Sequence, residues 1–238
     1  MRMRKKKHGE ERLLRCSEYL YSHEGAPLTD PSAEVFGAKA PVYLEIGAGK
    51  GGFAVGMTRQ NPGVAYFAME RVTDCVVLAA ERAKEEASDR LRFIIDTADN
   101  LTRIFGEGTV DAIFLNFSDP WSKKGYAKRR LTHARYLAVY MSLLKDGGIL
   151  RFKTDNVGLF DFSVEQVESV GLSFNKLTRD LHASEWNEGN VVTEYEAAFS
   201  SQGVKINMLE VVKPAGFSLP VPDDLKADRI SYRPVSED

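Results

Sequence analysis

A short turn that joins an acid, a proline and a tryptophan is the stretch of this sequence best suited to chemistry. Asp119, Pro120 and Trp121 follow an apolar run, and five cations come soon after them: Lys123, Lys124, Lys128, Arg129 and Arg130. A carboxylate on such a turn can hold a flat, amine-bearing ring, and clustered cations attract phosphate. The segment therefore predicts a site that receives a nucleic-acid base. A packed turn and a solvated charge run are the simpler structural alternatives.

A glycine-rich loop earlier in the chain could bind a cofactor. Three glycines at alternate positions follow the β-rich run 42–46: Gly47, Gly49 and Gly51. With Gly52 they also fit the dinucleotide spacing, and Glu70 stands where a carboxylate can accept both hydroxyls of a ribose. These residues predict an adenosine-containing cofactor. They do not separate a nicotinamide dinucleotide from S-adenosylmethionine, and a purely structural glycine turn stays open.

Glu45, two residues before the first glycine, favours S-adenosylmethionine. A carboxylate at this position would repel a pyrophosphate, whereas it would attract the ammonium and sulfonium charges of S-adenosylmethionine. The alternative is that Glu45 only caps the amides of the loop. We therefore predict S-adenosylmethionine as the cofactor and expect no bound metal.

Alternating strands and helices must position these residues. The sequence predicts strands at 42–46, 64–70, 91–95, 110–117 and 149–153. A helix is expected after each of them, at 53–60, 72–87, 101–105, 131–144 and 159–170. Gly147 and Gly148 are expected to end the fourth helix, and Gly171 the fifth. The alternation predicts an α/β fold in which helices cover both faces of a parallel sheet.

The last part of this region has its own signals. Thr193–Glu196 matches a capping box, which predicts a helix that runs to about residue 203. A final strand is expected at 204–212. Residues 214–238 contain several prolines and acids, and we expect them to form a peripheral or disordered tail.

The start of the chain is expected to be a basic arm. Residues 1–40 contain a possible short helix at 11–21, and they begin with a cluster of cations: Arg2, Arg4, Lys5, Lys6 and Lys7. Such a cluster repels itself unless an anion binds it, although a solvated terminus is an equally good interpretation. Residues 41–213 are then the catalytic domain.

Composition restricts the kind of protein. With 238 residues and a net charge of −2, the chain can form one full α/β domain, and any polyanion site must be a local patch. Its two cysteines, Cys16 and Cys75, lie far apart, which argues against a disulfide framework or a zinc site. No apolar run could span a membrane or act as a secretory signal. We therefore expect a cytoplasmic protein with no membrane partner.

Five stretches together resemble the bacterial TrmB-type tRNA (guanine-N7)-methyltransferases. They are Glu45–Gly51, Asn116–Lys124, Lys128–Leu131, Phe152–Asn156 and Thr193–Glu196. The similarity covers roughly residues 40–213, and the basic-turn and capping-box stretches are its specific parts. The resemblance implies a class I, Rossmann-like methyltransferase fold with a mostly parallel seven-stranded sheet. It also implies methyl transfer from S-adenosylmethionine to N7 of the variable-loop guanine of tRNA.

The resemblance also implies roles for particular residues. Cofactor contacts would come from Glu45, Gly47, Gly49, Gly51, Glu70, Thr97 and Asp119. Asp119 would in addition be the catalytic residue. Contacts to tRNA would come from Lys123, Gly125, Tyr126, Ala127, Lys128, Arg129, Arg130, Asp155, Thr193, Glu194, Tyr195 and Glu196. Thr97 departs from the family, which usually has an aspartate or asparagine there, and Ser122 and Gly125 depart from it in the basic loop.

The chemistry of guanine N7 limits what Asp119 has to do. N7 carries an in-plane lone pair and no proton, so its methylation needs positioning and removal of water rather than a general base. Asp119 is then an orienter of the base and a counter-charge for the cationic purine. Asp155 and Glu196 could accept the N1–H and N2–H₂ groups of guanine.

Two other classes of protein stay open on these residues alone. A nicotinamide-dependent oxidoreductase would share the glycine loop, but the C-terminal part offers no obvious group for hydride transfer. A non-catalytic RNA-binding protein would keep the basic loop without needing Glu45 and Glu70. The sequence also leaves open whether the protein is a monomer or a homodimer.

Overall fold

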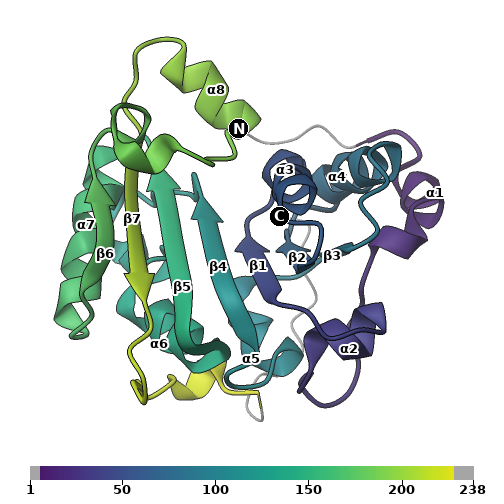
Figure 1. The fold of residues 1–238 in the computed structure, drawn as a ribbon, viewed down its shortest axis with the longest axis horizontal. Coiled ribbons are helices and arrows are strands. Elements are labelled where there is room, and N and C mark those ends of the chain that lie inside the picture. The colour runs from purple at the N-terminus through teal and green to yellow at the C-terminus, as the bar shows by residue number, and fades with distance from the viewer. Residues whose placement is uncertain (1–5, 228–238) are drawn as a thin grey trace.

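A seven-stranded sheet forms the centre of the computed structural model, which describes residues 6–227 (Figure 1). The strands are β1 (Val42–Ile46), β2 (Ala65–Met69), β3 (Leu91–Ile94), β4 (Val110–Asn116), β5 (Leu144–Thr154), β6 (Phe174–Thr178) and β7 (Asn207–Val212). They lie in the order β3-β2-β1-β4-β5-β7-β6, and among these described strands only β7 runs antiparallel to its neighbours. The arrangement confirms the predicted α/β fold.

Helices pack on both faces of this sheet (Figure 1). They are α1 (Gly9–Leu14), α2 (Pro31–Phe36), α3 (Gly52–Gln60), α4 (Thr73–Glu85), α5 (Leu101–Ile104), α6 (Ala134–Leu143), α7 (Val157–Ser169) and α8 (Glu194–Ser200). One face is covered by α3 and α4, with α1 against α4, and the other by α5, α6 and α7. None of the described helices is long and apolar enough to cross a membrane.

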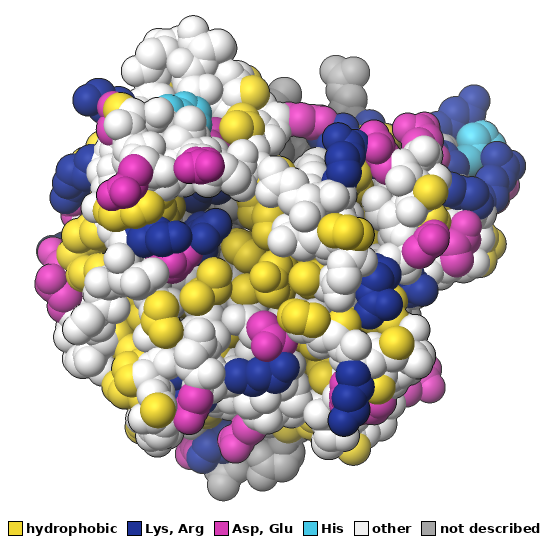
Figure 2. Space-filling model, viewed as in Figure 1, with side chains coloured by type: hydrophobic (Ala, Val, Ile, Leu, Met, Phe, Trp, Pro, Cys, Tyr) yellow, Lys and Arg dark blue, Asp and Glu magenta, His cyan; other side chains and the backbone are white. Residues whose placement is uncertain are grey.

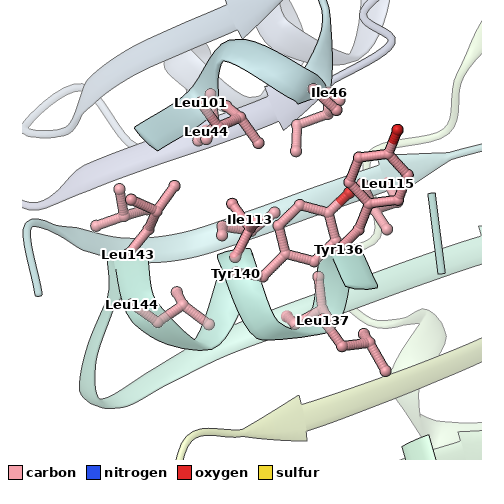
Figure 3. Packing of buried hydrophobic residues seen from close by; sticks show 14 of the residues in the cluster. Leu44, Ile46, Leu101, Ile113, Leu115, Tyr136, Leu137, Tyr140, Leu143 and Leu144 are labelled. Carbon is pink, nitrogen blue, oxygen red and sulfur yellow. The ribbon is translucent and has the colours of Figure 1, made fainter. Parts of the chain in front are cut away.

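The sheet is held between two apolar layers. Leu44, Ile113 and Leu115 from the central strands meet Leu137 and Tyr140 of α6 in the larger core cluster (Figure 3). All five residues of β2 are buried, as expected for a parallel strand covered on both faces. Close packing of this kind allows little movement of the strand ends, and those ends carry the predicted site residues.

The predicted end of the fourth helix is wrong. Helix α6 stops at Leu143, and Leu144 is already extended at the start of β5, beside Val110 of β4. Leu144 is fully buried, so packing against the neighbouring strand decides its conformation. Gly147 lies within β5 and donates its N–H to the carbonyl of Lys213. Gly171, in contrast, follows α7 with φ of 79°, as predicted.

Two elements do not appear among the local predictions. Helix α2 begins at Pro31 in its first position, after Asp30 as the capping residue, and no helix was predicted for this stretch. Strand β6 alternates half-buried and exposed residues at the edge of the sheet, and its polar residues hide the pattern of a strand.

The described parts of both chain ends pack against the domain. The backbone N–H of Lys6 donates to the carboxylate of Asp74 at 2.6 Å. Leu225 is buried, and its carbonyl accepts the hydroxyl of Thr102 at 2.6 Å, so this part of the predicted tail packs on the domain. Outside the described residues lie the predicted arm cations Arg2, Arg4 and Lys5.

Candidate active site

The predicted site residues meet at the carboxyl edge of the sheet. Strand β1 lies between β2 and β4, and β4 pairs with β5, so the loops that follow these four strands are neighbours. Open α/β sheets bind ligands at such an edge, where the strand order reverses. The loops there carry the glycines, Glu70, Asp119 and Asp155.

The glycine loop leaves open space at two positions. Gly47 and Gly49 have left-handed backbones, with φ of 84° and 54°, and a Cβ on either would meet no atom within 4 Å beyond its chain neighbours. A ligand can therefore approach the backbone closely there. Gly51 differs, because its Cβ would lie 2.8 Å from the Cβ of Ala79 in α4. Packing against α4 therefore requires glycine at position 51, and its predicted contact with the cofactor stays a prediction.

Glu70 supports the same loop from the end of β2. Its two carboxylate oxygens accept the N–H groups of Gly49 at 2.9 Å and of Val72 at 2.8 Å. Each oxygen of a carboxylate has a second lone pair, so acceptor capacity remains for ribose hydroxyls. The capping of loop amides that was considered for Glu45 is thus performed by Glu70.

Glu45 is buried under the loop and only half of its carboxylate is paired. Glu45 is 2% exposed, and Asn116 donates to its Oε1 at 3.0 Å. Oε2 makes no well-aligned hydrogen bond with the described residues, although the charge of Lys153 and the hydroxyl of Tyr66 both act on this carboxylate and lower its pKa. Burial raises the pKa of Glu45 to about 7, although the hydrogen bond from Asn116 opposes the rise. A buried carboxylate without full compensation is unfavourable, so a cationic ligand beside Glu45 would stabilise the site.

This geometry fits S-adenosylmethionine. The ammonium group of its methionine part would supply the donor and the charge that Glu45 Oε2 lacks. The open backbone at Gly47 and Gly49 would admit the cofactor, and Glu70 would hold its ribose. A dinucleotide would instead bring a negatively charged pyrophosphate to a buried acid, which is unfavourable.

Thr97 follows β3, the strand next to β2, at the same edge of the sheet. Its backbone N–H donates to Asp96 Oδ1 at 2.7 Å, and the same oxygen accepts Asn100 Nδ2 at 2.6 Å. The Thr97 hydroxyl makes no hydrogen bond with the residues that the structure describes. It is therefore available to an adenine amine, in the place where the family has an acid or an amide.

The turn that carries Asp119 is strained and presents its acid to solvent. Phe117 and Trp121, on either side of the turn, have left-handed backbones with φ of 52° and 41°, which non-glycine residues rarely adopt. Asp119 is exposed and forms no hydrogen bond or ion pair within residues 6–227. Strain of this kind is typical of functional sites. The carboxylate is thus free to meet a ligand.

Arg130 holds the turn in this shape. Its Nε donates to the carbonyl of Pro120 at 2.9 Å, and its Nη2 donates to the carbonyl of Trp121 at 3.1 Å. The guanidinium also lies 4.3 Å from the ring centre of Phe162 in α7. Two of its five N–H donors thus hold the backbone of the turn, and its predicted contact with phosphate stays a prediction.

The rest of the basic loop faces solvent. The 3-10 helix Lys124–Arg129 contains no buried residue, and it includes the predicted tRNA contacts Gly125, Tyr126, Ala127, Lys128 and Arg129. The guanidinium of Arg129 lies over the rings of Trp121 and Tyr126, at 5.1 and 4.9 Å. None of the five cations of this loop forms an ion pair among the described residues. Lys123, Lys124 and Lys128 also make no ring contact within residues 6–227, so these three are the least engaged.

The capping box at α8 is confirmed, but it places Glu196 inside the protein. The Thr193 hydroxyl oxygen accepts the N–H of Glu196 at 2.9 Å. Glu196 is 0% exposed and accepts hydrogen bonds from Lys153, His182 and Asn190. Burial acts to raise the pKa of Glu196, but the charge of Lys153 outweighs it and leaves the pKa below its usual value. Glu196 therefore holds the segment in place, and its predicted contact with guanine stays a prediction.

Tyr195 and Asp155 do face the site. The ring of Tyr195 lies 5.0 Å from the ring of Phe117, and its hydroxyl donates to Asp155 Oδ2 at 3.4 Å. Phe117 directly precedes the acidic turn, so Tyr195 and Phe117 form an aromatic wall beside it. Glu194 instead pairs with Arg82 of α4, away from that wall.

Lys153 is a residue of this region to which the sequence analysis assigned no role. It lies near the end of β5 with 1% of its side chain exposed, and burial lowers its pKa. Its ammonium group donates to Asn190, Val191 and Glu196. The available signal was its position, because a lysine inside an apolar strand is rarely buried unless it has a partner.

The fold and the site define a class I S-adenosylmethionine-dependent methyltransferase. The crystal structure of the 16S rRNA methyltransferase KamB matches with a TM-score of 0.59 at 13% identity, over 82% of this chain and 98% of that chain. A 16S rRNA adenine-N1 methyltransferase from Catenulisporales acidiphilia matches with a TM-score of 0.56 at 12% identity, over 81% of this chain and 95% of that chain. At this identity the likenesses show the fold alone.

The family follows from closer sequence relatives. The family model described as a putative methyltransferase matches residues 39–209. A tRNA (guanine-N(7)-)-methyltransferase from Lachnoclostridium phytofermentans is 46% identical over 176 residues, which are 74% of this chain and 82% of that relative. The chain belongs to the tRNA (guanine-N7)-methyltransferase family, as its motifs predicted.

Proposed function

We propose that the protein transfers a methyl group from S-adenosylmethionine to N7 of a guanine in tRNA, and that this guanine lies in the variable loop. One observation carries the proposal: two unsatisfied acids share one edge of the sheet. Glu45 Oε2 lacks a well-aligned donor beside the open glycine loop, which fits a cationic cofactor. Asp119 lacks a partner beside three free lysines, which fits a base on a phosphate backbone. Membership of the family supports N7 as the methylated atom.

The residues act by positioning. S-adenosylmethionine, when bound, supplies a methyl group on a positively charged sulfur. Guanine N7 carries no proton, so no side chain has to act as a base on it. Asp119 accepts hydrogen bonds from the N–H groups of the base and compensates for the positive charge that develops on the purine. Phe117 and Tyr195 give the base a surface for stacking and exclude water from it.

The remaining contacts are assigned from the hydrogen-bonding groups and charges that each residue has unused. Asp155 is a second acceptor for the base, held by Tyr195. The cofactor is held by Glu45, Gly47, Gly49, Glu70 and Thr97. The tRNA phosphates are held by Lys123, Lys124 and Lys128.

The lysines and arginines on the face seen in Figure 2 are scattered rather than gathered in one stripe. The middle of the face seen in Figure 2 carries mainly hydrophobic side chains, and most lysines and arginines lie nearer its periphery. Residues 1–40 are proposed to add a basic arm to the catalytic domain at 41–213, and 214–238 to form a C-terminal extension. The protein is proposed to act in the cytoplasm, as a monomer or a homodimer.

The choice of guanine is tested with tRNA transcripts. A transcript with guanine in the variable loop should gain one methyl group per molecule from S-adenosylmethionine. A matched transcript with adenine at that position should gain none, because adenine has no N1–H or N2–H₂ to offer Asp119 and Asp155. Equal methylation of both transcripts would contradict the assignment of the variable-loop guanine.

The free lysines should determine how tRNA binding depends on salt. Replacing Lys123, Lys124 and Lys128 by glutamine should weaken tRNA binding and reduce the slope of log Kd against log salt by about 2 to 3. Arg130→Gln is the matched control, since its donors bind the turn. It should lower turnover while leaving the slope unchanged. An unaltered slope in the triple variant would remove these lysines from the tRNA site.

A further inference from the structure

A buried ion pair that the proposed mechanism does not use lies directly beside the site. Lys153 is 1% exposed and Glu196 is 0% exposed, and Nζ and Oε2 are 2.6 Å apart. The ammonium group also donates to Asn190 Oδ1 at 3.0 Å and to the carbonyl of Val191 at 3.1 Å. All three of its hydrogens are therefore directed at one segment, 190–196, which begins 37 residues further along the chain.

A second ion pair on the same strand shows what is particular about the first. Arg151, two residues before Lys153 on β5, pairs with Glu210 of β7 at 2.5 Å. The two cations point to the same face of the sheet because strand residues alternate. Arg151 links two strands and has no described contact with segment 190–196. Lys153 instead links a strand to that segment.

Segment 190–196 crosses the two helices beside the glycine loop. Val191 lies against Gly56 of α3, where an added Cβ would come within 2.5 Å of Val191 Cγ1. Glu194 pairs with Arg82 of α4. The segment thus contacts both helices. Lys153 of β5 also binds the segment to the sheet.

The segment reaches the acidic turn through Tyr195. The Tyr195 ring lies 5.0 Å from the ring of Phe117, and Phe117 lies two residues before Asp119. The Tyr195 hydroxyl donates to Asp155, which follows β5 close to Lys153. A displacement of the segment would therefore move one side of the aromatic wall relative to Asp119.

We infer that Lys153 is a positioning residue for methyl transfer, which clamps segment 190–196 so that Tyr195 and Asp119 hold the guanine between them. The inference rests on the proposed function. Lys153 does not itself touch the base, because its ammonium is buried and its three hydrogens are engaged. Misplacement of a bound reactant by about 1 Å can slow a reaction by about 100-fold.

Lys153→Met tests this inference, with Arg151→Met as the control that breaks a comparable ion pair. In full-length protein, Lys153→Met should lower kcat by about 10-fold or more and change the KM for tRNA by less than about threefold. It should also speed amide hydrogen exchange in residues 190–196. Arg151→Met should change neither kcat nor that exchange at temperatures where it remains folded.

Equal kcat values for the two variants would overturn the inference, and so would unchanged exchange in residues 190–196 of Lys153→Met. If Lys153→Met does not fold, Asn190→Ala is the variant to measure. Asn190 is half-buried, and its replacement removes one acceptor of the Lys153 ammonium. It should shift both measurements in the same direction, and wild-type values for either would contradict the clamp. Failure of the proposed function looks different, because the wild-type protein would then produce no 7-methylguanosine.

Discussion

Replacing Asp119 by alanine should lower kcat for tRNA methylation by about 100- to 1000-fold, the range found when a group that stabilises developing charge is removed. The tRNA Kd should stay within about threefold of wild type, because the lysines rather than Asp119 contact the phosphates. Stability should hardly change, since exposed residues without partners contribute less than about 0.5 kcal/mol. Asp119 is such a residue among those described. Single-turnover kinetics and thermal melting measure these effects.

Glu107→Ala is a suitable control for Asp119→Ala. Glu107 is an exposed acid in the loop before β4, at the opposite edge of the sheet. It should leave both kcat and the melting temperature unchanged. Near-normal turnover by Asp119→Ala would show that the acid does not orient the base or balance its charge.

Replacing Glu45 by glutamine should weaken S-adenosylmethionine binding by about 10- to 150-fold, the value of a hydrogen bond to a charged group. The variant keeps an oxygen for Asn116 Nδ2 but lacks the negative charge at the unpaired position. Calorimetric titration with S-adenosylmethionine and with S-adenosylhomocysteine measures the loss. Glu107→Gln should bind both normally.

The same residue predicts how binding and stability depend on pH. Burial raises the pKa of Glu45 to about 7, above the roughly 4.3 of an unfolded glutamate. The free protein therefore loses stability as pH rises between these values, by up to about 3 kcal/mol, and Glu45→Gln should escape that loss. Cofactor affinity of the wild type should rise up to about pH 7 and then level off. A flat affinity profile between pH 6 and 8 would contradict the role of Glu45.

The parts of the fold that could be predicted are those where local sequence and burial agree. Strand β1 has the boundaries predicted for 42–46, and β4 those of 110–117 to within one residue, because both are apolar runs covered by helices. The end of α6 could not be predicted in this way. Leu144 and the glycines after it look like the end of a helix, and only pairing with β4 makes them a strand.

The sequence predicted which residues gather at the site, but it predicted the role of each residue less well. Sequence places Glu45, Glu70 and Asp119 at strand ends, and the structure brings all three to one edge. The sequence cannot distinguish Arg130 from Lys128, since both are cations of one loop. They differ because Arg130 donates to the carbonyls of Pro120 and Trp121, in a turn where Trp121 has a left-handed backbone.

Mass analysis of nucleosides from tRNA incubated with this protein and methyl-labelled S-adenosylmethionine tests the central claim most directly. We expect the label in 7-methylguanosine, in an amount that depends on Asp119. Label in a different methylated nucleoside, or none from folded protein that binds both S-adenosylmethionine and tRNA, would contradict the account.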